Sequence, residues 1–194
     1  MNPDRATFDL NDVRARCDKQ PRASGGPGDA RRGLAVCPFT IICDSREQLP
    51  YDFGGLLGAD GKPLIVPTVV TGLASGDYSI QGMEDRIAIE RKSLDDLYGS
   101  VTRGRERFER EITRLNELPG FAAVVIEASW AEIMAPAEHR PGWENRTDPR
   151  SVTGTILAWA IRYPGVWWFP AGNRRAAEVV TFGIMQRFWD EQQK

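Results

Sequence analysis

The chain has 194 residues, of which 41% are hydrophobic and 27% are charged, and its 25 Lys and Arg against 27 Asp and Glu give a formal net charge of −2. This composition is typical of one folded domain of ordinary size and excludes a disordered or fibrous chain. No basic surplus points to a nucleic-acid partner. Since His139 is the only histidine, the sequence also excludes an HExxH zinc site and any multi-histidine metal centre.

The N-terminal segment differs in composition from the rest of the chain. Residues 1–33 are rich in Gly, Pro, Asp and Arg, so we expect a flexible tail, with at most a short helix at 8–16, and a folded domain over 34–194. The N-terminus has no apolar signal segment, and no later run reaches the ~18 apolar residues that a membrane span needs. The sequence therefore predicts a cytoplasmic protein with no membrane partner.

The folded part, 34–194, contains six runs with the pattern of β-strands. Strands are predicted, in chain order, at 34–44, 63–73, 77–81, 86–92, 121–128 and 166–170. Pro67 interrupts the second run, which favours the edge of a sheet. The runs at 77–81 and 86–92 have the pattern of a β-hairpin. The continuous apolar run at 121–128 is typical of a strand that is buried on both faces.

Helical periodicity separates several of these strands. Helices are predicted at 94–100, 105–118, 151–163 and 174–193, the first with Ser93 as its N-cap. The last helix is expected to pack through apolar residues at helical spacing, namely Ala177, Val180, Ile184 and Phe188. Strands that alternate with helices predict an α/β fold with a central sheet flanked by helices on both faces.

The predicted hairpin carries most of the chemical information. Residues two apart on a strand face the same side, so Glu90 and Lys92 project together, and pairing of the two strands brings Asp77 close to them. Two carboxylates are suitable ligands for Mg²⁺ or Mn²⁺, and an adjacent lysine can orient or activate a water molecule. On its own such a pattern occurs often by chance. Asp44 and Glu47, at the end of the 34–44 strand, strengthen it, because strand ends usually carry the chemistry of α/β folds.

Two motifs link these residues to a known family. The segments GDY at 76–78 and IERKSLDDL at 89–97 resemble the GDx(n)ERKxxxD signature of XPF-type (ERCC-four-type) structure-specific DNA endonucleases, and CDSRE at 43–47 resembles the DxRE strand end of that family. The resemblance implies a restriction-endonuclease-like fold with a central mixed β-sheet. It also implies Mg²⁺- or Mn²⁺-dependent cleavage of branched or flapped DNA in repair or recombination.

The resemblance assigns roles to individual residues. It implies that Asp77 and Glu90 bind the metal, that Asp44 lies near it, and that Lys92 acts on the water. It implies a supporting shell made of Arg46, Glu47, Arg91 and Asp96. It places Arg103 and Arg105 against the DNA backbone, whereas the same role for Arg107, Arg110 and Arg114 stays open against a solvated helix face.

Two alternatives remain beside this interpretation. One is a DNA-junction-binding subunit without catalysis, and the other is a nickase or four-way-junction resolvase with a looser substrate preference. Many family members carry further DNA-binding modules, so a stand-alone nuclease domain is expected to gain specificity from a homodimer or a protein partner. The apolar helices near the C-terminus favour such an interface.

Overall fold

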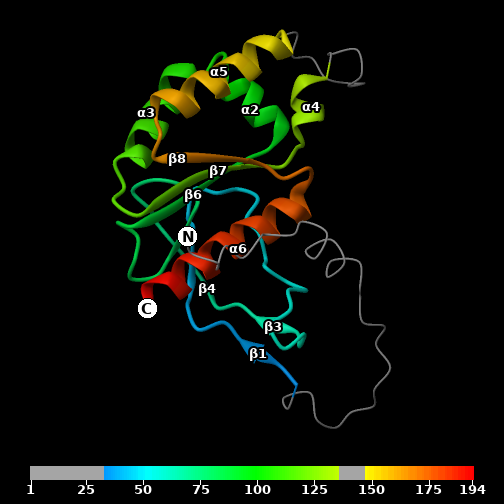
Figure 1. Ribbon diagram of the computed structural model, residues 1–194, viewed down its shortest axis with the longest axis vertical. Coiled ribbons are helices and arrows are strands. Elements are labelled where there is room, and N and C mark those ends of the chain that lie inside the picture. The colour runs from blue at the N-terminus through cyan, green and yellow to red at the C-terminus, as the bar shows by residue number, and fades with distance from the viewer. Residues whose placement is uncertain (1–32, 136–146) are drawn as a thin grey trace, which may run out of the picture. The chain divides into compact units, whose positions relative to one another are not determined.

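The computed structural model describes residues 33–135 and 147–194 (Figure 1). The chain divides into two compact units, Met1–Cys37 with Gly54–Ile65, and Pro38–Phe53 with Val66–Lys194. The predicted tail lies outside the described residues apart from Gly33, and so do the predicted helix at 8–16 and His139.

The described part of the first unit contains two short strands. Strands β1 (Ala35–Val36) and β3 (Leu64–Ile65) pair in parallel. The prediction of one continuous strand over 34–44 is wrong, since β1 ends at Val36 and β2 (Ile41–Asp44) begins only after Pro38. Pro67 likewise separates β3 from β4 (Thr68–Thr71) in the run predicted at 63–73. Proline donates no main-chain hydrogen bond and fixes φ, so each run breaks where a proline stands.

The second unit is built on a mixed six-stranded sheet. Its strands are β2, β4, β5 (Tyr78–Ile80), β6 (Ile87–Lys92), β7 (Phe121–Ile126) and β8 (Val166–Pro170). The spatial order is β4-β2-β5-β6-β7-β8. Strand β5 runs antiparallel to both β2 and β6, whereas the remaining neighbours are parallel. The mixed sheet, the β5–β6 hairpin and the edge position of β4 are confirmed.

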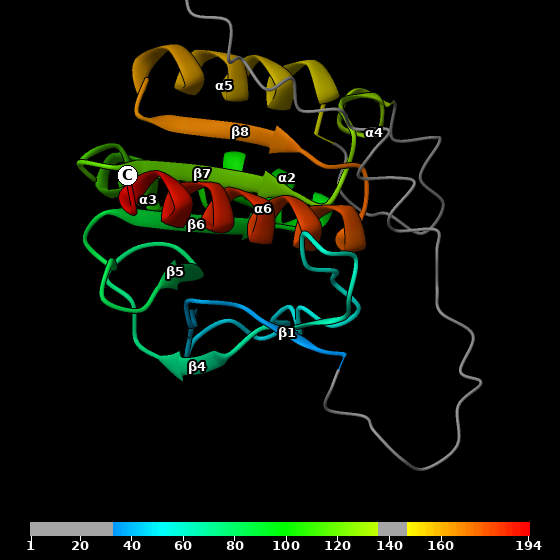
Figure 2. The ribbon, with the colours of Figure 1, turned by 60° about the horizontal axis from the view of Figure 1, so that its bottom comes forward.

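Helices cover both faces of this sheet. They are α2 (Leu94–Val101), α3 (Arg105–Asn116), α4 (Trp130–Met134), α5 (Pro149–Arg162) and α6 (Arg174–Gln192). Figures 1 and 2 show α2, α3, α4 and α5 on one face and α6 across β6 and β7 on the other, as the α/β prediction requires. Only the short α4, which begins with a capping box between Ser129 and Glu132, was not predicted. Over residues 33–135 and 147–194, no helix has the length and apolar character needed to cross a bilayer.

The core between the sheet and its helices follows the apolar patterns of the sequence. Strand β7 is buried from Ala122 to Ile126, and α3 buries Phe108, Ile112 and Leu115. Burial of this kind is worth roughly 1.5–3 kcal/mol for each large side chain. It fixes α3 against the sheet whose strand β6 carries Glu90 and Lys92.

The buried face of α6 differs from the prediction. Val180, Ile184 and Phe188 are only half-buried, and the buried residues are Ala177, Glu178, Thr181, Phe182 and Met185. The polar Glu178 belongs to the interior because its Oε1 accepts a hydrogen bond of 2.6 Å from the Phe53 amide and its Oε2 pairs with Arg175. A prediction from apolar residues alone places such a glutamate on the surface. The predicted buried face of α6 is therefore rotated about the helix axis relative to the observed one.

Candidate active site

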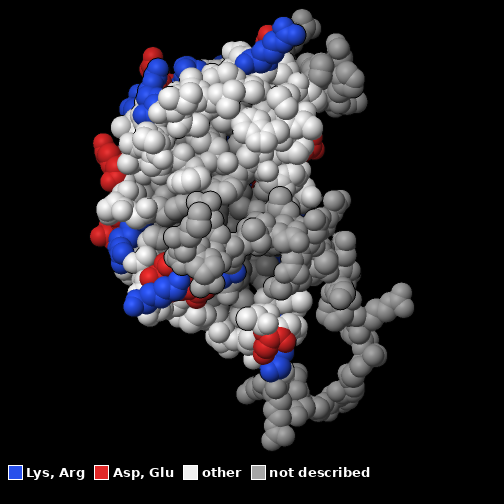
Figure 3. Space-filling model, viewed as in Figure 1, with Lys and Arg blue, Asp and Glu red and all other residues white. Residues whose placement is uncertain are grey.

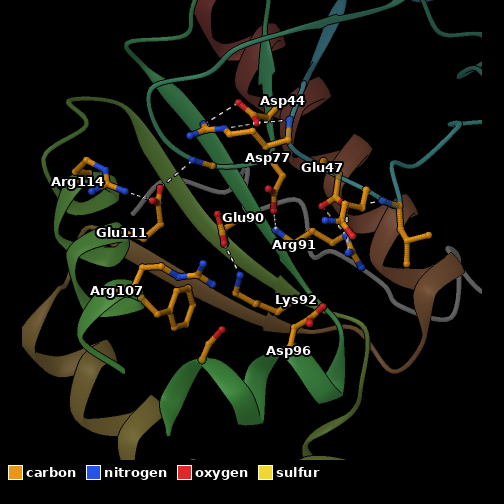
Figure 4. Close-up of a pocket in the computed structure, with 16 residues that line it drawn as sticks. Asp44, Glu47, Asp77, Glu90, Arg91, Lys92, Asp96, Arg107, Glu111 and Arg114 are labelled. Atoms are coloured by element: carbon orange, nitrogen blue, oxygen red, sulfur yellow. Dashed lines mark hydrogen bonds and ion pairs between the residues drawn. The ribbon is translucent and has the colours of Figure 1, made fainter. Parts of the chain in front are cut away.

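The β5–β6 hairpin brings Asp77 beside Glu90. Tyr78 pairs with Ile89 across the two strands, and the Asp77 amide donates to the Ile89 carbonyl at 2.8 Å. The Arg91 amide in turn donates to Oδ2 of Asp77 at 2.7 Å. The predicted meeting of Asp77, Glu90 and Lys92 is therefore what the structure shows, and Figure 4 shows all three around one pocket.

Glu90 and Lys92 form the centre of this pocket. Their side chains are 9% and 14% exposed, and Nζ of Lys92 lies 2.5 Å from Oε1 of Glu90. The same ammonium group lies 4.7 Å from the centroid of the Phe108 ring, which closes the pocket on the α3 side. The lysine is thus held in place by a charge and by an aromatic face.

Burial makes the two carboxylates costly to ionise together. Burial and the charge of Glu90 raise the pKa of Asp77 to about 8. Burial also raises the pKa of Glu90, although Lys92 opposes the shift. For Lys92 burial acts to lower the pKa, but the pairing with Glu90 outweighs it and the pKa is raised. One ammonium group therefore compensates incompletely for two carboxylates, and a bound cation would relieve their repulsion.

Asp44 lines the same pocket, but both of its carboxylate oxygens already accept hydrogen bonds from protein groups. Its Oδ1 accepts from the amide and Nε of Arg46, both at 2.8 Å, and its Oδ2 accepts from Nη2 of Arg46 at 2.9 Å and from the Leu73 amide at 2.6 Å. The hydrogen bond from Arg46 lowers the pKa of Asp44 to about 2. Asp44 thereby ties Arg46 and Leu73 to the end of β2, and its role beside a metal stays a prediction.

Arg91 lines the pocket and joins three segments of the chain. Its guanidinium pairs with Glu47 at 3.0 Å and with Glu127 at 3.1 Å, and all three side chains are at most 10% exposed. Glu127 also pairs with Arg174, whose Nη2 donates to the Leu49 and Pro50 carbonyls. The structure brings the predicted Glu47 and Arg91 together. Glu127 and Arg174 were not predicted as site residues. The position of Glu127 could have indicated it, because Glu127 directly follows the apolar strand β7, much as Asp44 is the last residue of β2.

Asp96 lies on the first turn of α2. Its amide donates to Ser93 Oγ at 3.1 Å, and its carboxylate accepts from the same hydroxyl at 2.7 Å. This exchange confirms Ser93 as the N-cap. Asp96 also lines the pocket, so it connects the position of α2 to the end of β6, where Lys92 stands.

Arginines surround the opening of the pocket. Arg46, whose side chain is 73% exposed, lines it together with Arg107 and Arg114 of α3. Glu111, between them on the same helix, was not predicted as a site residue, because nothing in the local sequence separates it from the other acids of α3. Figure 4 shows Glu111 between Arg114 and the strand ends.

The two arginines predicted to contact DNA lie outside the pocket lining. Arg103 is exposed in the turn before α3. The Nη1 of Arg105 donates to Thr155 Oγ1 at 2.9 Å, and its guanidinium lies 5.0 Å from the Trp159 ring centroid. Arg105 therefore packs on α5, and the DNA contact of both residues stays a prediction.

The residues of the pocket fit a hard divalent cation. In the part of the chain that the structure describes, no three His, Cys, Asp or Glu side chains form a complete metal site. Asp77 and Glu90 nevertheless supply two neighbouring carboxylates, and one oxygen of each is committed to Arg91 or Lys92. Mg²⁺ is commonly bound through one or two carboxylates while it keeps several waters. The donor set is thus sufficient for Mg²⁺ or Mn²⁺.

Fold and site together define a mixed α/β domain with a pocket at its strand ends that is lined by acidic and basic side chains. The sequence model of the ERCC4 domain matches residues 43–177, a range that contains every predicted site residue. The chain therefore belongs to the ERCC4 domain family. No match is found among curated protein sequences.

Solved structures of XPF from Aeropyrum pernix share this fold. One superposes with a TM-score of 0.53 at 19% identity, over 80% of this chain and 65% of that chain. The other, a complex of XPF with DNA, superposes with a TM-score of 0.54 at 21% identity, over 79% of this chain and 66% of that chain. The chain thus spans slightly less than two thirds of the length of each.

Proposed function

We propose that this protein is a divalent-metal-dependent DNA endonuclease that hydrolyses phosphodiester bonds, with branched, flapped or forked DNA as its substrate in repair or recombination. Membership of the ERCC4 domain family supports a role on DNA, as a nuclease or as a junction-binding protein. The observation that carries the catalytic proposal is the pairing of the part-buried Asp77 carboxylate and the buried Glu90 carboxylate beside Lys92.

Asp77 and Glu90 are the proposed ligands of Mg²⁺ or Mn²⁺. A cation bound there would offset charge on the phosphate and lower the pKa of a bound water. Lys92 Nζ, fixed by Glu90 and the Phe108 ring, is placed to donate a hydrogen bond to the attacking water or to a phosphoryl oxygen. In this proposal Asp44 fixes Arg46 at the pocket opening.

The arginines at the opening suit a phosphate backbone. Arg46, Arg107 and Arg114 line the same pocket as the acids, and a guanidinium matches the geometry of a phosphate. Contacts of this kind place the backbone without reading its sequence. That the related XPF structure was solved with DNA supports the same partner for this chain.

A homodimer or a protein partner is the proposed source of branch specificity. Leu157 and Ile161 on α5 are 53% and 83% exposed, and Trp167 on the edge strand β8 is 58% exposed. Figure 3 shows mostly uncharged atoms on the visible surface around α5, with charged side chains gathered along its edges. Exposed apolar side chains of this size are typical of protein interfaces.

The proposal is tested by comparing the cleavage of four labelled DNAs, namely a flap, a fork, a four-way junction and a plain duplex. All four are compared at one salt concentration, because the affinity of a protein for the DNA phosphate backbone varies steeply with salt. Each is incubated with Mg²⁺, Mn²⁺ or EDTA. We expect metal-dependent cleavage, strongest on the flap or fork, that is lost in folded Asp77→Ala and Lys92→Ala proteins and kept in Lys194→Ala. Preferential cutting of the four-way junction would favour a resolvase. Junction binding in EDTA without cleavage under any metal would favour the non-catalytic alternative.

A further inference from the structure

Glu111 connects helix α3 to the segment that carries Asp77. Its Oε1 accepts a hydrogen bond of 3.1 Å from the amide of Gly76, which lies 35 residues away in the chain and directly precedes Asp77. Its Oε2 is paired with Arg114 on the next turn of α3. Glu111 itself lines the pocket and its side chain is 20% exposed.

We infer that Glu111 is a positioning residue, which holds Gly76, directly before Asp77, so that the Asp77 carboxylate faces Glu90 and a bound cation. The inference rests on the proposed function, because it assigns Glu111 a part in the site formed by Asp77, Glu90 and Lys92. No contact between Glu111 and the cation is needed for this role.

The Gly76 amide needs a side-chain acceptor because it lies beyond the hydrogen-bonded hairpin. The Asp77 amide already donates to Ile89, and the chain before it turns with a φ of +73° at Gly76. A Cβ at Gly76 would lie 3.1 Å from both the Ala88 Cβ and the Ile89 carbonyl oxygen. Since a part-buried amide without an acceptor is costly, the Glu111 carboxylate completes the turn.

Three further hydrogen bonds that hold Asp77 in place involve main-chain groups of its partners. The Asp77 amide donates to Ile89, its carbonyl accepts from the Asp44 amide at 2.8 Å, and its Oδ2 accepts from the Arg91 amide. Ile89, Asp44 and Arg91 take part in these three bonds through main-chain atoms, so substitution of their side chains would not remove the bonds. Glu111 is consequently the contact at this turn that a substitution can remove while the hairpin backbone is left intact.

An ordinary surface pair on a helix would not explain this arrangement. A Glu–Arg pair three residues apart stabilises a helix only slightly, and to a similar extent wherever it occurs. Glu109 offers the comparison on the same helix, since its carboxylate pairs with Arg162 and Tyr163 and lies outside the pocket lining. Only Glu111 of these two acids reaches the turn before Asp77.

Three variants separate the hydrogen bond from the charge. Glu111→Ala removes the acceptor, Glu111→Gln keeps an amide oxygen that can accept from Gly76, and Glu109→Ala is the matched control on α3. Loss of a partner that orients a metal ligand typically costs 10–100-fold in metal affinity or activity. We expect Glu111→Ala to lower kcat and Mn²⁺ affinity by about tenfold or more without raising KM for DNA. Glu111→Gln should recover most of both, and Glu109→Ala should match the parent.

Mn²⁺ affinity is measured by electron paramagnetic resonance without DNA, and cleavage is measured separately on a flap. Hydrogen exchange of the Gly76 amide is compared in the parent and in Glu111→Gln, where it should stay protected. Parent-like Mn²⁺ affinity and kcat in Glu111→Ala would overturn the inference, and so would equal impairment of Glu111→Ala and Glu111→Gln. If the parent binds Mn²⁺ but cuts no DNA while the variants differ in affinity as expected, the proposed function fails and the positioning role of Glu111 stands.

Discussion

The main-chain amide of Arg91 donates a 2.7 Å hydrogen bond to Oδ2 of Asp77, across the hairpin formed by β5 and β6. The donor lies between Glu90 and Lys92, so the strand that supplies the second acid and the lysine also orients the first acid. An amide hydrogen bond favours the ionised carboxylate, but burial of Asp77 outweighs it. The backbone of the hairpin therefore holds two acids together at a place where they repel each other.

This repulsion predicts a pH-dependent gain in stability for Asp77→Asn. Burial and Glu90 raise the pKa of Asp77 from 3.8 to about 8. The folded state then binds more protons than the unfolded state between these values, so the stability contribution of Asp77 is lost as pH rises from about 4 through 8. Asparagine keeps an acceptor for the Arg91 amide and does not ionise. We expect the variant to raise the free energy of unfolding of the metal-free protein by a few kcal/mol at pH 8, which is the order of magnitude of the free energy that corresponds to the pKa shift. At pH 4 the variant should raise it by little.

Urea denaturation in EDTA at the two pH values measures this difference. A stability change of equal size at pH 4 and pH 8 would show that Asp77 is not the titrating group. Lys194→Ala, whose pairing with Glu191 is exposed, serves as the control and should change stability little at either pH.

Divalent cations should stabilise the folded protein through the same carboxylates. A ligand that binds only the folded state contributes about 2.7 kcal/mol at a hundredfold excess over its Kd. We expect Mn²⁺ to raise the Tm of the parent and to leave the Tm of Glu90→Gln almost unchanged. Differential scanning calorimetry over a Mn²⁺ titration checks this, and an equal rise in both proteins would place the stabilising ion elsewhere.

Arg91 should be among the most important side chains for stability. Arg91→Met leaves the buried Glu47 carboxylate without its ion-pair partner, whereas Glu127 still pairs with Arg174. Removing one partner of a buried pair costs about 3–5 kcal/mol, because a buried charge is left uncompensated. We expect a loss of about this size in chemical denaturation. A loss below about 0.5 kcal/mol, as for exposed pairs, would contradict the structural role of Arg91.

Substitution at Gly76 should disturb the site through the backbone. Gly76 has a φ of +73°, which favours glycine, and a Cβ there would be crowded by Ala88 and Ile89. We expect Gly76→Ala to destabilise the protein by about 1–3 kcal/mol and to reduce DNA cleavage. Gly72→Ala is the matched control, because a Cβ at Gly72 would meet no atom within 4 Å. Equal effects of the two substitutions would argue against strain at Gly76.

Arg103 and Arg105 should respond differently to alanine substitution. Arg103 is exposed, and its loss is expected to weaken binding to all DNAs alike and to lower the salt dependence of binding by about one ion. Arg105 packs on Thr155 and Trp159, so its loss should also lower stability by about 1 kcal/mol. Binding titrations at several salt concentrations, together with denaturation curves, separate the two effects. An unchanged salt slope in Arg103→Ala would remove that residue from the DNA contact.

Local patterns were sufficient to predict much of the fold. The apolar run of β7 and the hairpin of β5 and β6 depend on neighbouring residues, so their sequence patterns survive in the structure. The errors in the predicted strands and helices occur where a single residue changes the structure that the surrounding sequence pattern predicts. Pro38 ends β1 early, and the buried Glu178 rotates the inner face of α6.

The candidate site was predictable only in part, for a related reason. The register of one hairpin places Asp77 beside Glu90 and Lys92, and a hairpin can be recognised in the sequence. Glu111 and Glu127 reach the site through tertiary contacts with Gly76 and Arg91, which lie 35 or 36 residues away. Before folding, such acids look like any other acid of a helix or a loop. The net charge of −2 misled for the same reason, since it counts buried pocket acids as if they were surface charges.

Anomalous diffraction from crystals soaked in Mn²⁺ shows whether Asp77 and Glu90 hold the cation that serves DNA cleavage. We expect one strong anomalous peak within coordination distance of both carboxylates, and its disappearance in crystals of Asp77→Asn. A soaked parent crystal without a peak between Asp77 and Glu90, or a peak there that persists in Asp77→Asn, would show that these two carboxylates do not hold the cation.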